Sequence, residues 1–149
     1  MKSLGLRIGV IAVIVIAGVI LRPFISGNAS DLSVGDCFDL PTSTATEVKD
    51  VQHHPCDQDH GGEVIWVGNY PGTKSDPYPT DPEMFAFVSS QCIPVYNTYT
   101  GKDLTTQLEW DVNWLQPTED GWKKGDLKVT CFLFRVDNTK FKGSQKAAG

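Results

Sequence analysis

Hydrophobic residues near the start of the chain form one unbroken run, Ile8–Leu21, whereas short apolar stretches alternate with polar ones beyond Arg22. Extended to Leu4–Ile25, the apolar segment would be about 33 Å long as a helix, enough to cross the roughly 30 Å hydrocarbon core of a membrane. Lys2, Arg7 and the amino terminus outnumber Arg22 across this segment. The pattern predicts one transmembrane helix, with the amino terminus in the cytoplasm and the remainder of the chain outside.

The competing interpretation of residues 1–27 is a signal peptide that is removed after export. Gly27-Asn28-Ala29 offers the small residues that a signal peptidase inspects. Arg22-Pro23 argues against removal, because a charge and a helix breaker fit a helix that meets the membrane interface better than a cleavage region. The sequence therefore favours an uncleaved anchor over residues 1–27, followed by a linker at residues 28–31.

Two apolar stretches rich in β-branched residues, Glu63–Tyr70 and Leu127–Val136, predict the central strands of a sheet. Partial alternation of apolar and polar residues over Glu47–Gln52 and Leu104–Leu115 predicts further strands with one face covered. The proline-rich stretch Tyr70–Pro82 can sustain neither a helix nor a central strand, so we expect a long loop there.

One principal helix is expected to begin at Asp81, a good N-cap that precedes a proline at the first helical position. Pro94 should end or kink this helix near Ile93, because proline disfavours helical geometry in the residue before it. The apolar side chains that follow Asp81 at helical spacing are Met84, Phe85, Val88, Cys92 and Val95.

A single helical turn over Thr118–Lys124 should seat Trp122 against the sheet before Gly125 turns the chain into the next strand. The resulting fold class is α+β: an antiparallel sheet with one principal helix packed on it, preceded by the transmembrane helix. Residues 32–144 are long enough for one domain and too short for two comfortable ones. Residues 145–149 have nothing to bury and should form a flexible tail.

The charge of the chain excludes one class of partner. Of the 13 Lys and Arg, three lie in or beside the apolar segment, which leaves 10 against 18 Asp and Glu, a formal charge of 10 minus 18, or −8. A nucleic-acid-binding face needs clustered basic residues that neutralise phosphates. We therefore expect no nucleic acid partner.

One cluster of side chains could carry chemistry. It occupies eight positions and contains His53, His54, Cys56, Asp57, Asp59 and His60. A small metal-dependent hydrolase that uses this cluster is the rival functional hypothesis. However, the Cys-x3-His pair lacks the second pair that makes zinc-ribbon spacing specific, and Cys56 would form a disulfide in an oxidising compartment. The structural alternative is a polar turn in which His60 hydrogen-bonds the turn backbone.

Other signals of catalysis are weak in this sequence. Ser89 and Ser90 lie on the predicted helix outside any GxSxG context, and no Gly-rich cofactor loop is evident. The sequence therefore predicts a protein that is not an enzyme and that carries neither a cofactor nor a metal.

A series of short motifs, each present once, spans most of the chain beyond the apolar segment. They are Leu32-Ser33-Val34-Gly35-Asp36-Cys37-Phe38, Val51, Pro55-Cys56-x3-His60-x2-Glu63-Val64, Tyr70-Pro71-Gly72, Cys92, Trp122-x2-Gly125-Asp126-x2-Val129-x-Cys131 and Gly143-Ser144. In order and spacing they resemble the septum-formation domain family, found in membrane-anchored or exported proteins of actinobacteria and their relatives. Leu127 departs from the family, which often carries arginine after Gly-Asp.

The resemblance implies a link to cell division and the septal envelope, and it brings no catalytic residue or cofactor. The motif residues expected to be structural are Gly35, Asp36, His60, Glu63, Trp122, Gly125 and Asp126. The expected function is that of a non-enzymatic, single-pass membrane protein whose extracytoplasmic domain binds an unidentified protein or cell-wall partner. A passive structural module is a further possibility.

Four cysteines follow the apolar segment, and an even count fits an oxidising compartment. They allow three pairings. We predict that Cys37 pairs with Cys56 and Cys92 with Cys131, because each bond would then join elements expected to be neighbours. The first would tie the opening strand to the end of the next strand, and the second would hold the principal helix on a central strand.

Overall fold

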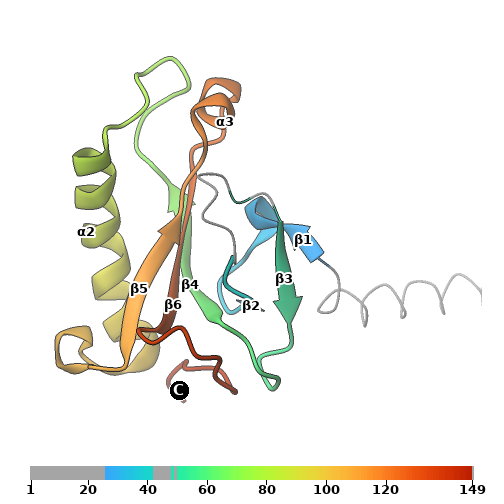
Figure 1. Cartoon of the computed structure of the whole chain (residues 1–149). Helices are drawn as coiled ribbons and strands as arrows, with labels where there is room; N and C mark the ends of the chain where they lie inside the picture. The colour runs from blue at the N-terminus through green and yellow to red at the C-terminus, as the bar shows by residue number, and fades with distance from the viewer. Residues whose placement is uncertain (1–25, 42–47, 49, 149) are drawn as a thin grey trace, which may run out of the picture.

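The structure, a computed structural model, describes residues 26–41, 48 and 50–148 (Figure 1). The transmembrane helix expected over Leu4–Ile25 lies outside the described residues. Among the helices of the described part, none has the length and apolar character that a membrane span requires.

A six-stranded antiparallel sheet forms the body of the described chain, in the order β1-β3-β2-β4-β6-β5. Its strands are β1 (Ser26–Asn28), β2 (Cys37–Phe38), β3 (Asp50–His54), β4 (Gly62–Asn69), β5 (Trp110–Leu115) and β6 (Lys128–Arg135). The helices are α2 (Asp81–Thr100), the shorter α3 (Glu119–Lys124) and the 3-10 turns η2 (Ala29–Asp31) and η3 (Leu104–Thr106). The α+β class with an antiparallel sheet and one main helix is thus confirmed.

The two strands predicted to be central, β4 and β6, lie inside the sheet and pair from Gly62↔Phe134 to Asn69↔Lys128. Successive residues of a strand face opposite sides. Cys131 and Leu133 of β6 therefore join the core beneath α2, whereas Phe132 joins a second core on the other face. Because both faces are covered, these strands read as nearly continuous apolar runs.

The buried apolar side chains form two cores, one on each face of the sheet. The first lies between α2 and the sheet, which pack side by side in Figure 1, and includes Met84, Val88 and Tyr96 of the helix. The second lies on the opposite face, where residues of η2, β2 and β3 meet β4 and β6, and its Phe38 and Phe132 rings make an edge contact with centroids 5.2 Å apart.

Helix α2 differs from the prediction at its start. The N-cap is Thr80, and Asp81 is the first helical residue. The Glu83 carboxylate accepts a 2.8 Å hydrogen bond from the Thr80 amide, which satisfies one of the backbone donors left free at a helix start. A cap one residue earlier therefore replaces the one expected at Asp81.

The prediction that Pro94 ends or kinks the helix near Ile93 is wrong in its boundary, because α2 continues to Thr100 and is capped by Gly101 in the left-handed conformation. Proline within a helix costs about 3 kcal/mol. On this helix Cys92, Tyr96 and Thr100 are buried on either side of Pro94. The free energy gained by burying this face of the helix outweighs the cost of Pro94.

The covalent links agree with the expected pairing. The structure joins Cys37 to Cys56 and Cys92 to Cys131, with Cα atoms 5.3 Å and 5.7 Å apart. The second bond connects α2 to β6 within the first core. The bonds therefore join the elements expected to be neighbours: β2 with the end of β3, and α2 with β6.

Other predicted elements are shifted or shortened. The strand expected over Leu104–Leu115 begins only at Trp110, because η3 occupies Leu104–Thr106 and Leu108 is exposed. The strand expected over Glu47–Gln52 corresponds to β3, Asp50–His54, and residues 47 and 49 lie outside the described part. The helical turn expected over Thr118–Lys124 is α3, and its Trp122 is buried.

The expected linker and tail are both tied to the fold. Strand β1 pairs with β3, and Ala29 of η2 is buried, so residues 28–31 belong to the domain. The Gln145 amide donates to Glu63 and the Ala147 amide donates to the Tyr99 carbonyl, so the prediction of a loose tail is wrong for these residues. Backbone hydrogen bonds, which need no apolar side chain, hold this segment.

Candidate functional site around the Cys37–Cys56 disulfide

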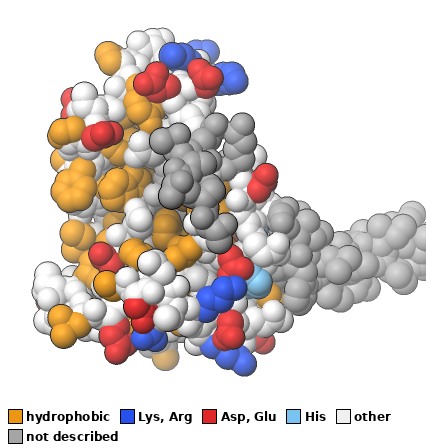
Figure 2. Space-filling model, viewed as in Figure 1, with side chains coloured by type: hydrophobic (Ala, Val, Ile, Leu, Met, Phe, Trp, Pro, Cys, Tyr) orange, Lys and Arg blue, Asp and Glu red, His pale blue; other side chains and the backbone are white. Residues whose placement is uncertain are grey.

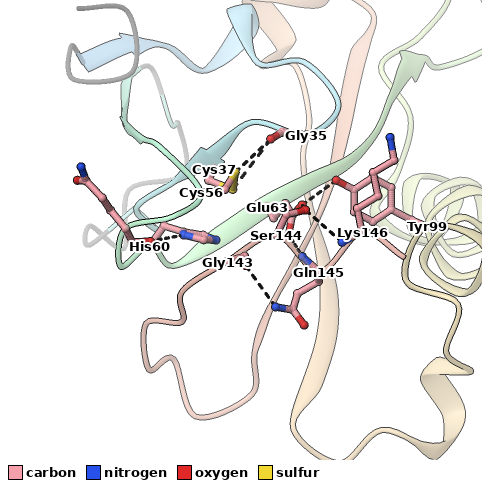
Figure 3. The surroundings of a disulfide bond; sticks show 11 residues. Gly35, Cys37, Cys56, His60, Glu63, Tyr99, Gly143, Ser144, Gln145 and Lys146 are labelled. Atoms are coloured by element: carbon pink, nitrogen blue, oxygen red, sulfur yellow. Dashed lines mark hydrogen bonds between the residues drawn. A yellow bond between two sulfur atoms is a disulfide. The ribbon is translucent and has the colours of Figure 1, made fainter. Parts of the chain in front are cut away.

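A buried polar cluster lies beside the Cys37–Cys56 disulfide, where β2, the turn before β4, and the C-terminal segment meet (Figure 3). It contains Glu63 of β4 and His60 of the preceding turn, and neither side chain has exposed surface. Burial of ionisable groups is unfavourable unless hydrogen bonds replace water. The partners of these two side chains therefore decide what the site can do.

Glu63 is surrounded by donors. Its Oε1 atom accepts hydrogen bonds from the Tyr99 hydroxyl, at 2.7 Å, and from the Ser144 hydroxyl. Its Oε2 atom accepts the Gln145 amide at 2.7 Å. Burial, the hydrogen bond to Glu63 and the negative charge there all raise the pKa of Tyr99. The carboxylate thus joins β4 to α2 and to the C-terminal segment.

His60 is held by the C-terminal segment on one side and by its own turn on the other. Its backbone forms a reciprocal pair of 3.0 Å hydrogen bonds with Phe141, and its ring packs edge-on against the Phe141 ring with centroids 4.2 Å apart. The ring Nδ1 lies 2.8 Å from the Gln58 carbonyl, the backbone contact that the polar-turn interpretation expects. The buried Nε2 has no hydrogen-bond partner among the described residues.

Gly35 and Asp36 form the turn that starts β2. Gly35 has φ of 92°, a conformation that favours glycine, and its amide donates to the Val64 carbonyl at 2.8 Å. The Asp36 carboxylate accepts the Ser33 amide at 2.8 Å. The Gly35 carbonyl lies 3.4 Å from the Cys56 sulfur, a packing contact, since a disulfide sulfur carries no hydrogen to donate.

Gly125 and Asp126 form a similar turn before β6. Gly125 caps α3 with φ of 97°, and the Asp126 carboxylate accepts the Lys128 amide at 3.1 Å. Trp122, one turn earlier, donates from its indole nitrogen to the Asp76 carbonyl at 2.9 Å and packs between the rings of Tyr70 and Tyr78. These contacts attach the long loop before α2 to the sheet.

The His53–His60 cluster does not converge on one point in the structure. His54 pairs with Asp39 at 2.9 Å, and Asp57 and Asp59 are exposed. Cys56 is in the disulfide, and His60 turns toward Glu63 instead (Figure 3). Within the described residues, the side chains that come close enough to share a metal are Cys37, His60 and Glu63, whose ligand atoms lie within 4.8 Å of one another.

A groove of about 690 Å³ opens on the sheet face opposite α2. Most of its lining is apolar, from Leu40, Pro41, Val48, Trp114, Leu115, Phe132 and Phe134, and its polar lining includes Asp39, Asn113, Asn138 and Lys140. Lys140 and Asp39 form a 2.7 Å ion pair at this polar side. Burial alone would raise the pKa of Asp39, but the hydrogen bonds and positive charges of Lys140 and His54 outweigh it and lower the pKa.

Exposed apolar surface continues from the groove toward α2. Trp114 lines the groove and makes an edge contact with Phe85 of α2, which is 60% exposed. Figure 2 shows hydrophobic side chains gathered at the left of the view, where Figure 1 places α2 and β5. Because β5 is an edge strand, this surface borders the open side of the sheet.

The chain matches the family model described as Septum formation over residues 33–148. It belongs to the septum-formation family. No curated protein and no solved structure matches it. The matched residues include both disulfides and the buried cluster, and the family is not known as enzymatic.

Sequence reasoning found the buried centre of this septum-formation domain but missed what surrounds it. Glu63 and His60 were singled out, whereas Tyr99 and Gln145 were not, because their partners lie 36 and 82 positions away along the chain. The Gly143-Ser144 motif was the one available signal that the C-terminal segment contacts the cluster. The groove was also missed, since its lining comes from two strands, β5 and β6, and from the connections that follow β2 and β6 and precede β3 and β4.

Proposed function

We propose that this septum-formation protein is a non-enzymatic envelope protein, anchored once in the membrane, whose disulfide-stabilised domain stands outside the cytoplasm and binds a protein partner during cell division. The family match supports the link to division. Two disulfides support an extracytoplasmic domain, because such bonds persist in oxidising compartments.

The observation that carries the choice of a binding role is the apolar groove beside β5. Binding sites are concave and mostly apolar, with a few polar groups that fix orientation. This groove has that composition, with the aromatic side chains Trp114, Phe132 and Phe134 and the Asp39–Lys140 pair in its lining. A protein segment with apolar side chains fits it better than a cell-wall glycan, which would need more hydrogen-bonding groups.

The edge of β5 suggests how the partner binds. Asp111 accepts the Val112 amide at 2.7 Å, and Asn113 accepts the Trp114 amide at 2.8 Å. Amides that already donate to neighbouring side chains are less available to an added strand. The partner's side chains, rather than its backbone, therefore make the main contacts in the groove.

The buried cluster supports a structural rather than catalytic role for Glu63. Its two oxygens accept hydrogen bonds from three other residues and join α2 to the C-terminal segment. The rival hydrolase hypothesis needs the His53–His60 side chains to act together. Their separation into different contacts favours the binding role.

A photo-crosslinking amino acid tests the proposal in dividing cells that make the full chain. Placed at Asn113, on the exposed rim of the groove, it should give a discrete adduct with an envelope protein of the division site. Placed at Asn69, an exposed asparagine at the end of β4, it should give none. Equal adducts at the two positions, or no adduct at Asn113, would contradict the assigned surface.

The link to division has a separate readout. A fluorescent fusion of the full chain should be enriched at the septum, and Asn113→Arg should reduce that enrichment because it places a charge beside the apolar lining. Asn69→Arg is the matched control and should leave enrichment unchanged. A uniform distribution of the unmodified fusion around the cell would count against a role at the septum.

A further inference from the structure

Three buried side chains of metal-binding chemistry converge beside the first disulfide. The ligand atoms of Cys37, His60 and Glu63 lie within 4.8 Å of one another, and each side chain is at most 2% exposed. They come from β2, the turn before β4, and β4 itself (Figure 3). The fold therefore holds a sulfur, a nitrogen and an oxygen around one point.

His60 is oriented as a metal ligand would be. Its Nδ1 faces the Gln58 carbonyl, which can only accept, so Nδ1 carries the proton of the neutral ring. The buried Nε2 is then left with a free lone pair and has no partner among the described residues. In metal sites the second ring nitrogen is commonly fixed by a backbone carbonyl in this way.

Glu63 keeps the capacity to bind a cation. Its Oε2 atom accepts one hydrogen bond, from the Gln145 amide. A carboxylate oxygen has two lone pairs, so one remains on this atom. Coordination through this atom would leave the contacts of Oε1 with Tyr99 and Ser144 in place.

The Cys56 sulfur, which is bonded to that of Cys37, lies next to these three groups and would supply a fourth ligand. The Cys37–Cys56 disulfide offers no thiolate while it is intact. Reduction by an external dithiol converts it to two thiols and leaves the dithiol as a disulfide, so two electrons pass from the dithiol to the protein. A zinc ion then replaces the two thiol protons, which are released.

We propose that reduction of the Cys37–Cys56 bond opens a zinc site made of Cys37, Cys56, His60 and Glu63. Two thiolates, one imidazole and one carboxylate are ligands that zinc accepts in tetrahedral geometry. Zinc–ligand bonds of about 2.0 to 2.3 Å place such ligands roughly 3.3 to 3.8 Å apart. The ligand atoms of Cys37, His60 and Glu63, which lie within 4.8 Å of one another, must contract by about 1 Å in the widest pair, and the Cys56 sulfur must move away from that of Cys37 once their bond is broken.

The second disulfide remains closed in this change. Cys92 and Cys131 are both buried within the first core, whereas Cys56 is partly exposed. A reductant therefore reaches the first bond from solvent and leaves the helix attached to the sheet. The zinc site does not depend on the partner-binding role proposed above, and either can fail without the other.

Cobalt binding tests the site in the full-length protein, purified in detergent and treated with a phosphine reductant that does not chelate metal. The reduced protein should bind one Co²⁺ per chain, with thiolate-to-cobalt absorption that Zn²⁺ removes. The oxidised protein should bind none. Alkylation and peptide mapping, done on the metal-free reduced sample, should show Cys37 and Cys56 open and Cys92 and Cys131 still joined.

Two histidine variants separate this site from non-specific thiol binding. Loss of an outer-shell partner alone costs a metal site about 10- to 100-fold in affinity, so His60→Gln should cost more than about 100-fold. His54→Gln is the matched control, since His54 pairs with Asp39 outside the cluster, and it should retain full affinity.

Near-ultraviolet circular dichroism monitors folding in every sample, and Glu63→Gln provides a second variant if His60→Gln does not fold. It should also weaken cobalt binding. The proposal is overturned if the reduced wild-type protein unfolds or binds no cobalt, if the oxidised protein binds as well, or if both cluster variants retain wild-type affinity.

Discussion

At the scale of single residues, Glu63 is held by contacts on every side that its hydrogen bonds reach. It has no exposed surface, and the groups that donate to it come from α2 and from the last residues of the described chain. A buried acceptor surrounded by donors stabilises a fold only as long as every donor keeps its partner. Changes at this position should therefore affect segments distant in sequence.

Glu63→Gln should lower the free energy of unfolding by about 1 to 3 kcal/mol, because one oxygen becomes an amide nitrogen that cannot accept and leaves a buried donor unpaired. Chemical denaturation followed by tryptophan fluorescence measures the loss. Glu109→Gln is the control, since that side chain is 69% exposed and should change stability by less than about 0.5 kcal/mol. Equal effects of the two substitutions would show that the network contributes nothing.

Tyr99 should make the fold sensitive to alkali. Its pKa in the folded state is raised above the ordinary value of 10.0, first by burial and then by Glu63, so the folded protein holds this proton more tightly than the unfolded chain. The stabilisation is complete below about pH 10 and is lost as the pH rises above it. Tyr99→Phe should flatten that decline in denaturation curves recorded from pH 8 upward. Burial also raises the pKa of Tyr96, so the Tyr99→Phe variant should keep part of the decline in stability. A slope equal to that of the unmodified protein would refute the assignment to Tyr99.

At the scale of elements, α2 shows where a local rule yields to packing. The sequence predicted that this helix ends or kinks near Ile93 because of Pro94. In the structure one face of α2 stays buried as far as Thr100. The disulfide from Cys92 to Cys131 holds the helix two residues before the proline. The chain-entropy account gives about 3.9 kcal/mol for a closed loop of about 40 residues, comparable with the cost of the proline.

Pro94→Ala should stabilise the protein by about 1 to 3 kcal/mol, because alanine restores a backbone donor and removes the ring from an exposed position in the helix interior. Thermal or chemical denaturation against Ser90→Ala, an exposed substitution one turn earlier, measures the gain. Unchanged or reduced stability would mean that the geometry imposed by Pro94 is needed for the helix to fit the sheet.

The two disulfides should open in a fixed order. Cys56 is partly exposed, whereas Cys92 and Cys131 are at most 2% exposed. Thiol–disulfide exchange requires access to a sulfur atom. Graded reduction with alkylation and peptide mapping should therefore label Cys37 and Cys56 first. Simultaneous labelling of all four cysteines would indicate that the whole domain opens before either bond is reached.

At the scale of the whole molecule, the sequence predicted what depends on neighbours in the chain and missed what depends on contacts between distant segments. The strands β4 and β6, the start of α2 and the buried Trp122 each have a local pattern. The groove and the donors around Glu63 have none, because the segment after β2, β5, α2 and the C-terminal segment come together only after folding. The loose tail was mispredicted for the same reason, since backbone amides give no signal in a side-chain pattern.

Both ends of the described chain are part of one hydrogen-bonded body. At the amino end β1 pairs with β3, and the Lys128 ammonium donates to the carbonyls of Ser30 and Leu32. At the carboxyl end the Ala147 amide bonds to α2. A cut in either segment would therefore remove contacts that the sheet uses.

This arrangement bears on whether the apolar amino-terminal segment is kept. Cleavage after Ala29 would remove β1, the buried Ala29 and the Asn28 side chain that accepts the Ser30 amide at 2.9 Å. We therefore predict that the mature protein retains Leu4–Ile25 as an anchor, with the domain outside the membrane. Amino-terminal sequencing of the cell-associated protein should show a chain that begins at or near Met1, and alkaline carbonate should leave it in the membrane fraction. A soluble chain in the medium that begins near Ser30 would replace the anchor with a secretion signal, and it would also require the sheet to be stable without β1.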